Sequence, residues 1–359
     1  MELGTASAAP GELARGRLTV TELPTGIDEQ VPVIIANGTE DGPTLWLTAA
    51  IHGDEVTGLA VAQDVIVEEL PDRLAGTVVC VPALNPAGLR QTSRTSYYDG
   101  DDPNRYFPDP DLTAEERPRP PAVQELIDER LYEAITDSAD ALIDLHTAQI
   151  GSAPFLIRDR VLYGEIREKE AAARLSREVG TVAAAFGLPV VREYAAAEYT
   201  DQNLQRSTAG AVLNNAGIPA VTVELGTHGV VDERLRAIGV RGCYNVMVEL
   251  GLLEAQPPFS PAVEAPPSPV DYPVKRAVHP HTETPGIVRH HVEPGDVIEA
   301  GESVAEIVTP TGEHRATIET DHDGYVIGRY EGVAAYENDA VTSLAVRDDG
   351  DLVVPRDPE

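Results

Sequence analysis

The stretch TLWLTAAIHGDE, residues 44–55, shows how this chain is built. Its first eight residues are apolar or threonine with no helical period, which predicts a buried strand, and the glycine and acidic residues after it end that strand. Residues 58–70 then carry apolar side chains at helical spacing and stop at Pro71, which predicts a helix. A buried strand that leads directly into a helix is typical of an α/β sheet covered on both faces.

The same alternation continues along the chain. Further strands are predicted at 31–36, 77–84, 139–145, 189–193 and 219–225, and further helices at 121–137, 164–186, 203–216 and 232–253. Residues 90–121 are rich in Asp, Pro, Arg and Tyr, and a loop of that length inside a compact domain is usually functional. Residues 1–253 are therefore expected to form one catalytic α/β domain.

A proline-rich segment follows this domain. Residues 254–273, EAQPPFSPAVEAPPSPVDYP, contain seven prolines and favour a semi-rigid linker rather than a helix or a central strand. Beyond it the pattern changes to short apolar runs separated by glycine turns, with no helical period. The sequence thus predicts a small all-β domain over residues 274–359.

The charge composition of the chain limits the kinds of molecule that it can bind. The chain has 359 residues, of which 27 are Lys or Arg and 60 are Asp or Glu, giving a net charge of −33. Its only lysines are Lys169 and Lys275, and this acidic, lysine-poor composition is typical of proteins from salt-loving organisms such as haloarchaea. Nucleic acids and anionic membrane surfaces are excluded as partners of so acidic a surface. Formation of a homo-oligomer remains compatible with the sequence.

Cysteine usage and the N-terminus indicate the compartment. Cys80 and Cys243 lie in apolar runs and predict two buried thiols, because two cysteines make neither a disulfide framework nor a zinc cluster. The N-terminus lacks the pattern of a signal peptide, and no apolar stretch approaches the length of a membrane span. We expect a soluble, cytoplasmic protein.

Two short motifs carry candidate metal ligands. His52 and Glu55 follow the strand at 44–51, and sites in open α/β sheets lie beyond the carboxyl ends of strands. His146 ends another buried strand and would complete three ligands of the kind that catalytic zinc uses, with one position left open. Asp144 could orient its imidazole. The alternatives are a capped helix start at 54–55 and a hydrogen-bonded core histidine.

Other polar residues stand at positions that suggest catalysis. Glu224 lies in the Val-rich run VTVELG, which predicts a buried position, and burying a carboxylate without a partner is costly. A metal site beside Glu224 would allow it to act as a general acid and base. Arg94, Asn104 and Arg105 lie in the long loop and could bind a carboxylate or stabilise an oxyanion. Structural or surface ion pairs are the alternative for all of these residues.

Together these motifs resemble a known family. The order HGDE (52–55), NPAG (85–88), Arg94, DPNR (102–105), DLHT (144–147) and VELG (223–226) resembles the succinylglutamate desuccinylase/aspartoacylase family of the zinc-carboxypeptidase clan. The resemblance spans roughly residues 30–250. It implies a zinc-carboxypeptidase-like mixed sheet flanked by helices, followed by a small all-β, barrel-sandwich-like domain, with one Zn²⁺ ion per chain.

The resemblance also implies a set of roles: zinc ligation by His52, Glu55 and His146, general acid/base catalysis by Glu224, polarisation of the scissile carbonyl by Arg94, and binding of the substrate carboxylate by Asn104 and Arg105. We therefore expect a zinc-dependent amidohydrolase that uses metal-activated water to cleave the amide bond of a small anionic N-acyl amino acid. N-succinyl, N-acetyl and N-acetyl-diaminobutyrate substrates all fit. The alternatives are a metallocarboxypeptidase acting on peptides and a non-catalytic metal-binding protein.

The C-terminal sequence has its own resemblance. Residues 292–301, VEPGDVIEAG, and 323–326, DGYV, resemble a lipoyl/biotinyl-like module. The candidate hairpin at 316–326 has no carrier lysine, so a structural or oligomerisation role is expected. Six of the nine histidines lie after residue 273, including His279, His281, His290 and His291. Their spacing matches no metal-site template, and we expect exposed or loop histidines, with a second metal site as the alternative.

Overall fold

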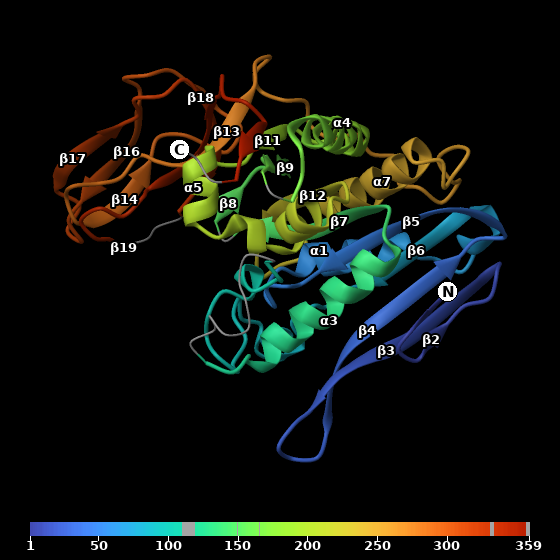
Figure 1. The fold of residues 1–359 in the computed structure, drawn as a ribbon. Helices are drawn as coiled ribbons and strands as arrows, with labels where there is room; N and C mark the ends of the chain where they lie inside the picture. Colours follow the sequence, from blue (N-terminus) through green and yellow to red (C-terminus); the bar gives the residue numbers. More distant parts are fainter. Residues whose placement is uncertain (110–118, 149, 165, 331–333, 357–359) are drawn as a thin grey trace.

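One large mixed sheet forms the centre of the molecule. The computed structural model describes residues 1–109, 119–148, 150–164, 166–330 and 334–356. Within these residues, thirteen strands make up the sheet (Figure 1). From one edge to the other they are β15 (Val297–Ile298), β18 (Gly324–Arg329), β20 (Thr342–Arg347), β13 (Val274–Val278), β11 (Val190–Arg192), β9 (Phe155–Arg158), β12 (Ala220–Thr227), β7 (Ala141–Ala148), β5 (Glu40–Ala49), β6 (Ala75–Val81), β4 (Asp28–Asn37) and β3 (Glu12–Glu22), with β8 (Gly151–Ser152) paired to β18.

The middle of the sheet is parallel and covered by helices on both faces. β6, β5, β7 and β12 run parallel, whereas β9 pairs antiparallel with β12. The Trp46 indole donates a hydrogen bond to Ser138 in α3 (Val123–Ser138), while the Cys80 thiol contacts the Ala62 carbonyl in α1 (Val56–Val65). Because Cys80 pairs with Leu47, the residue after Trp46, these two helices lie on opposite faces. α7 (Glu233–Glu249) packs against α1, and α4 (Lys169–Phe186) packs against α7.

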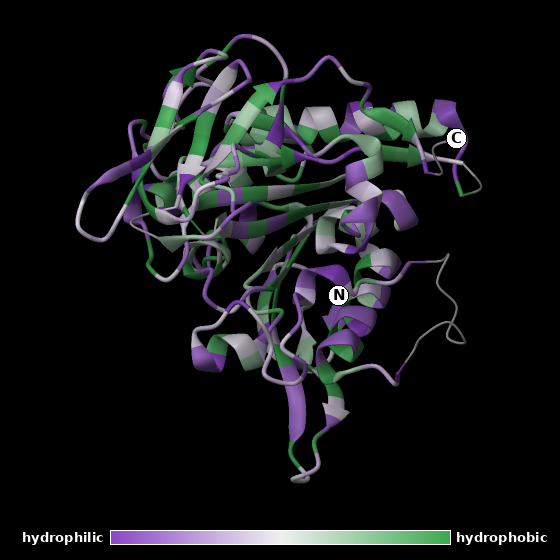
Figure 2. Cartoon of the chain, turned by 90° about the vertical axis from the view of Figure 1, so that its left-hand side faces the viewer, coloured by the Kyte–Doolittle hydropathy of each residue, from purple (hydrophilic) through white to green (hydrophobic). Residues whose placement is uncertain are grey.

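Burial follows this layering. Figure 2 shows hydrophobic residues concentrated along the strands and hydrophilic residues on loops and outer helix surfaces. Trp46, Leu47, Cys80 and Leu145 are completely buried, and Cys243 in α7 is buried as well, as the sequence predicted for both cysteines. The α/β fold class is confirmed. Among the described residues, no helix combines the length and the apolar character that crossing a membrane requires.

Two local predictions were wrong. The single helix expected at 203–216 is a succession of short pieces, namely η4 (Leu204–Arg206), α6 (Thr208–Ala211) and η5 (Val212–Ala216). Asn203 has a φ of 55°, and the Ser207 side chain caps a new helix by accepting from the Gly210 amide, so the chain turns where the pattern suggested continuity. β3 was not predicted, because its side chains are exposed or half-buried and give no apolar run.

The long loop at 90–121 contains a short structured piece. α2 (Pro86–Gln91) leads into it, and η2 (Pro103–Arg105) holds residues that the sequence singled out. The side chain of Asp102 accepts from the Asn104 amide and so fixes the start of η2. Residues 110–118 of this loop lie outside the described residues.

The chain after the linker continues the same sheet. Residues 254–273 contain no helix or strand, and Phe259 packs edge-on against Tyr244 of α7. β13 then pairs parallel with β11 and antiparallel with β20, so C-terminal strands extend the catalytic sheet. A second, antiparallel sheet contains β17 (His314–Glu319), β16 (Ser303–Val308), β14 (Gly286–His290) and β19 (Ala334–Ala335). The division into domains at 1–253, 254–273 and 274–359 stays a prediction.

Candidate active site

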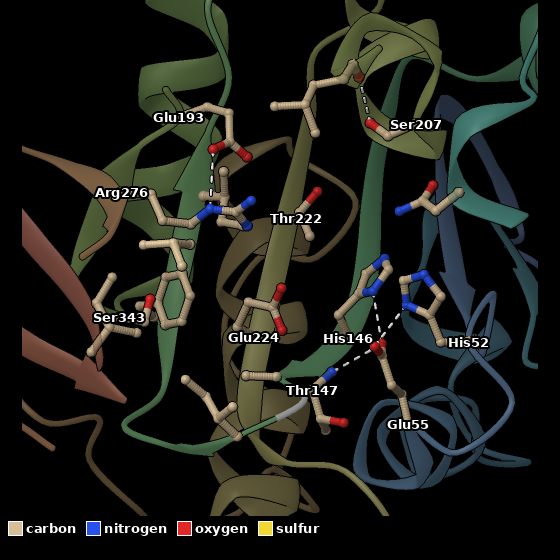
Figure 3. Close-up of a pocket in the computed structure, with 18 of the residues that line it drawn as sticks. His52, Glu55, His146, Thr147, Glu193, Ser207, Thr222, Glu224, Arg276 and Ser343 are labelled. Atoms are coloured by element: carbon tan, nitrogen blue, oxygen red, sulfur yellow. Dashed lines mark hydrogen bonds and ion pairs between the residues drawn. The ribbon is translucent and has the colours of Figure 1, made fainter. Parts of the chain in front are cut away.

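Three side chains from neighbouring strands meet at one end of a pocket, which we call the metal-ligand end (Figure 3). His52 follows β5, Glu55 directly precedes α1, and His146 lies within β7. Nδ1 of His52 lies 2.7 Å from one Glu55 oxygen, and Nδ1 of His146 lies 2.7 Å from the other. One ligand atom from each residue lies within 4.8 Å of the others. The three predicted zinc ligands are therefore together, almost completely buried.

Carboxylates hold the outer nitrogens of both imidazoles. Nε2 of His52 lies 3.0 Å from Asp102, and Nε2 of His146 lies 2.7 Å from Asp144, which also accepts from the Thr48 hydroxyl. Such contacts fix the ring orientation and the tautomer of metal-binding histidines. The contact between Asp144 and His146 supports the orienting role proposed for Asp144. Asp102 contacts His52 in the same way. The position of Asp102 in the DPNR motif did not by itself predict this contact.

Charge at this end favours an ionised carboxylate. Burial opposes ionisation of Glu55, but His52 and His146 outweigh it and hold the pKa of Glu55 well below its usual range. Burial likewise lowers the pKa of His146, while Asp144 and Glu55 raise it well above the usual value. Two imidazoles facing an ionised carboxylate form the donor set that zinc prefers.

Glu224 lies in β12, beside this cluster. The parallel register pairs Glu224 with His146 and Thr222 with Asp144, so their side chains share one face of the sheet. Figure 3 shows Glu224 between the histidines and the opposite side of the pocket. Its Oε2 atom is buried and has no hydrogen-bond partner among the described residues. Burial raises the pKa of Glu224, and the nearby His146 only partly offsets this. The carboxyl group is thus placed to exchange a proton with a ligand in the pocket.

The predicted loop residues line the same pocket. Arg94 donates to Glu55 over 3.3 Å and to Asp102 over 2.9 Å, next to the metal-ligand end. Asn104 is buried, and its Oδ1 accepts from the amide and hydroxyl of Thr208. Arg105 donates from one guanidinium nitrogen to the Asn104 carbonyl over 2.6 Å and lies 4.0 Å from Asp102, and its guanidinium lines the pocket. All seven predicted site residues are therefore brought together, and their individual roles remain predictions.

The opposite side of the pocket, the far end, contains residues that sequence reasoning missed. Asp159 follows β9, Glu193 follows β11, and Arg276 lies in β13. Arg276 forms an ion pair with Glu193 at 3.2 Å and lies over the ring of Tyr194, 4.7 Å from its centre. β11 and β13 pair at Arg192 and Lys275, which places Glu193 and Arg276 next to each other. No local motif signals this contact, because Arg276 comes from beyond the proline-rich segment.

Asp159 differs from Glu193 in having no partner. Its side chain makes no hydrogen bond or ion pair with any of the described residues, although it is only 5% exposed. Burial, together with the charge of Glu193, raises the pKa of Asp159 well above its usual range, against the opposing effect of Arg276 and Arg105. The pocket therefore combines arginines with a buried carboxyl group that has no hydrogen-bond or ion-pair partner among the described residues.

Known proteins resemble this chain over most of its length. The model of the succinylglutamate desuccinylase/aspartoacylase catalytic domain matches residues 41–250. An N-alpha-acetyl-L-2,4-diaminobutyric acid deacetylase from Halomonas elongata is 27% identical over 340 residues, which cover 90% of each chain.

Solved structures share the fold. A succinylglutamate desuccinylase from Silicibacter sp. TM1040 superposes with a TM-score of 0.73 at 21% identity, covering 97% of this chain and 100% of its own. The product-bound ectoine utilization protein EutE (DoeB) from Ruegeria pomeroyi gives a TM-score of 0.72 at 22% identity, covering 95% and 98%. The family match includes every predicted site residue, from His52 to Glu224. This chain belongs to the succinylglutamate desuccinylase/aspartoacylase family, a family of N-acyl amino acid deacylases.

Proposed function

We propose that this protein is a zinc-dependent hydrolase that removes the acyl group from an N-acylated amino acid with a positively charged side chain. N-α-acetyl-2,4-diaminobutyrate is the leading candidate. The observation that carries the proposal is the arrangement of one pocket, which contains a buried His–Glu–His set, the Oε2 atom of Glu224 beside it and the carboxyl group of Asp159 at the far end. Neither that Glu224 atom nor the Asp159 carboxyl group has a hydrogen-bond partner within the part of the chain that the structure describes.

The metal-ligand end fits a zinc ion. Nδ1 of His52, Nδ1 of His146 and the Glu55 carboxylate would hold it, and Asp102 and Asp144 would keep both imidazoles in the orientation needed. A bound zinc ion would supply Lewis acidity toward water and toward the scissile carbonyl. Three protein ligands are the number found in catalytic rather than structural zinc sites.

Glu224 supplies the proton transfers in this proposal. Its Oε2 takes a proton from the attacking water and later delivers that proton to the leaving amine nitrogen. Arg94 lies beside Glu55 and can donate to the carbonyl oxygen as negative charge develops there. Asn104 and Arg105 hold the α-carboxylate of the substrate, for which the planar guanidinium of Arg105 is suited.

The far end supports a cationic side chain. A buried carboxyl group without a partner is costly, and the ammonium group of a substrate would provide the missing partner for Asp159. Arg276 is neutralised by its ion pair with Glu193, so its charge is not available to a second substrate carboxylate. The cavity volume of about 280 Å³ suits a small acyl amino acid. The Halomonas relative, whose name specifies acetyl-diaminobutyrate, supports the same choice.

A substrate panel tests the proposal. Zinc-loaded protein is given N-α-acetyl-2,4-diaminobutyrate, its uncharged analogue N-acetyl-2-aminobutyrate, N-acetylaspartate, N-succinylglutamate and a blocked dipeptide, and released acid is quantified by proton NMR. We expect the diaminobutyrate derivative to have the highest kcat/KM. A preference for either dicarboxylic substrate would contradict the cationic side chain, and a preference for the dipeptide would indicate a carboxypeptidase.

A further inference from the structure

A second group of potential metal ligands lies outside the active site, in the C-terminal β-region. His279 directly follows β13, while Asp321 and His322 lie in the turn between β17 and β18. The chain changes sheet several times in this region, and two of these crossings are the one from the large sheet to the smaller one between β13 and β14 and the one back to the large sheet between β17 and β18. The three residues therefore come from these two crossings, and His279 lies 42 residues before Asp321 in the sequence.

The spacing of the three side chains is that of ligands around a metal. Oδ1 of Asp321 lies 3.5 Å from Nδ1 of His279 and 3.4 Å from Nε2 of His322. Ligand atoms of a tetrahedral zinc ion, with bonds near 2.0–2.1 Å, stand about 3.3 Å apart. The rings of His279 and His322 have centres 5.1 Å apart and are inclined at 63°. All three ligand atoms lie within 4.8 Å of one another.

One of these ligand atoms lacks a hydrogen bond. Nδ1 of His279 is buried, and it neither donates nor accepts a hydrogen bond within the part of the chain that the structure describes. Other histidines of this region use a ring nitrogen in a specific bond: His290 with the Val341 carbonyl, and His291 with the Ser303 hydroxyl. A buried nitrogen aimed at a carboxylate and left unbonded is what a metal ligand requires.

The backbone holds the ligands in place. The His279 amide donates to the Thr342 carbonyl over 3.0 Å, which ties it to β20. The His322 amide donates to the hydroxyl of the buried Thr320, and the Thr320 amide donates to the Glu302 carbonyl. Two segments that are each fixed by the sheet thus present their side chains to one point, which reduces the cost of ordering them around an ion.

We propose that His279, Asp321 and His322 form a second divalent-metal site, suited to zinc or a similar borderline cation. Two imidazoles and one carboxylate are a donor set that such cations prefer, and the acidic surface of the protein raises the local concentration of cations. The site is partly exposed, with 43% of the His322 side chain and 73% of the Asp321 side chain accessible, so the ion can enter directly from solvent. Its role is to tie the two crossings together, three residues beyond Arg276 of the far end.

Zinc stoichiometry tests this proposal. Untagged protein is stripped with a chelator, dialysed against micromolar free zinc and analysed for metal. We expect two zinc ions per chain in the wild type and one in the His279→Asn/His322→Asn variant. The matched control is His291→Asn/His314→Asn, which removes two histidines of the same β-region outside the proposed ligand set and should retain two zinc ions.

The His146→Ala background separates the new site from the active site. There we expect one zinc ion per chain, and none once the His279→Asn/His322→Asn changes are added. Zinc should raise the melting temperature of His146→Ala protein, and should not do so in the triple variant. The single change Asp321→Asn, at an exposed side chain, tests the same site with little risk to folding and should weaken zinc binding at least tenfold. Zinc content unchanged by these substitutions, or no zinc in the His146→Ala protein, would overturn the proposal.

Discussion

The two ends of the pocket are built in different ways. At the metal-ligand end, each imidazole contacts Glu55 with one nitrogen and a second carboxylate with the other, so every side chain has its orientation fixed. At the far end, Arg276 and Glu193 neutralise each other, while Asp159 has no ion-pair or hydrogen-bond partner among the residues described. We propose that the two ends have different roles: the rigid end performs the chemistry, and the end with the unpaired carboxyl group selects the substrate.

The largest effect should come from Glu224, which stands between the two ends. Glu224→Gln keeps the size of the side chain and removes the group that accepts the proton. We expect turnover to fall by roughly 10³-fold with zinc content unchanged, since general acid/base groups contribute about 10²–10⁴-fold. Steady-state kinetics together with metal analysis measures both. Loss of zinc from this variant would place Glu224 among the ligands instead.

Asp159→Asn tests the selecting role of the far end. Removing the charge that faces the substrate ammonium should lower kcat/KM for N-α-acetyl-2,4-diaminobutyrate by about 30-fold, within the range of charge-assisted hydrogen bonds. The uncharged analogue N-acetyl-2-aminobutyrate is the control and should be hydrolysed at an unchanged rate. Equal losses for both substrates would assign Asp159 to the structure of the pocket and not to selectivity.

The pH dependence of selectivity gives a smaller effect. The pKa of Asp159 is raised by burial and by Glu193, so its ionised form, which pairs with an ammonium group, is gained as pH rises through that raised pKa. The ratio of kcat/KM for the charged substrate to that for the uncharged one should therefore increase with pH. Using a ratio cancels titrations common to both substrates. A ratio that is flat with pH in the wild type would contradict the assignment.

The smallest effect concerns the support of the far end. Asp348 binds both the buried Arg160, which follows Asp159, and Arg192, over 3.0 and 3.1 Å. Asp348→Asn should lower the free energy of unfolding by about 2 kcal/mol near neutral pH, with zinc binding at the metal-ligand end unaffected. Chemical denaturation measures the first quantity and metal analysis the second.

This stabilisation has a predictable pH dependence. Burial raises the pKa of Asp348, but Arg160 and Arg192 outweigh it and leave the pKa below its usual range. A carboxyl group whose pKa is lowered on folding stabilises the protein above its unfolded-state pKa, and this contribution disappears as pH falls through the folded-state pKa. The difference between wild type and Asp348→Asn should therefore shrink in acid. A difference that grows in acid would contradict the ion pairs.

Sequence reasoning predicted one end of the pocket and missed the other for a physical reason. His52 and Glu55 follow the carboxyl end of β5 and His146 lies near that of β7, and carboxyl ends of adjacent parallel strands meet at one edge of a sheet. Local patterns therefore suffice to place them. Glu193 follows a strand of only three residues, and its partner Arg276 arrives on β13 from the region predicted to be a separate domain. Such a contact depends on strand pairing across the linker, which no local pattern encodes.

The fold shows the same limit. Buried strands such as β5 and β7 were predicted because their apolar runs are unambiguous, whereas the half-buried β3 alternates too weakly to be recognised. The segment 203–216 was predicted to be one helix, but a turn at Asn203 and a helix cap at Ser207 divide it. Tertiary contacts decide such segments, since the apolar pattern is the same in either case.

The most direct test of the central claim is reconstitution of activity with zinc. The His279→Asn/His322→Asn variant, with only the active-site ligands intact, is stripped of metal and titrated with zinc while acetate release from N-α-acetyl-2,4-diaminobutyrate is followed. We predict that turnover is absent in the stripped protein, rises in proportion to added zinc and reaches a plateau at one ion per chain, while a His146→Ala version stays inactive throughout. Full turnover by protein that metal analysis shows to be stripped would contradict the account.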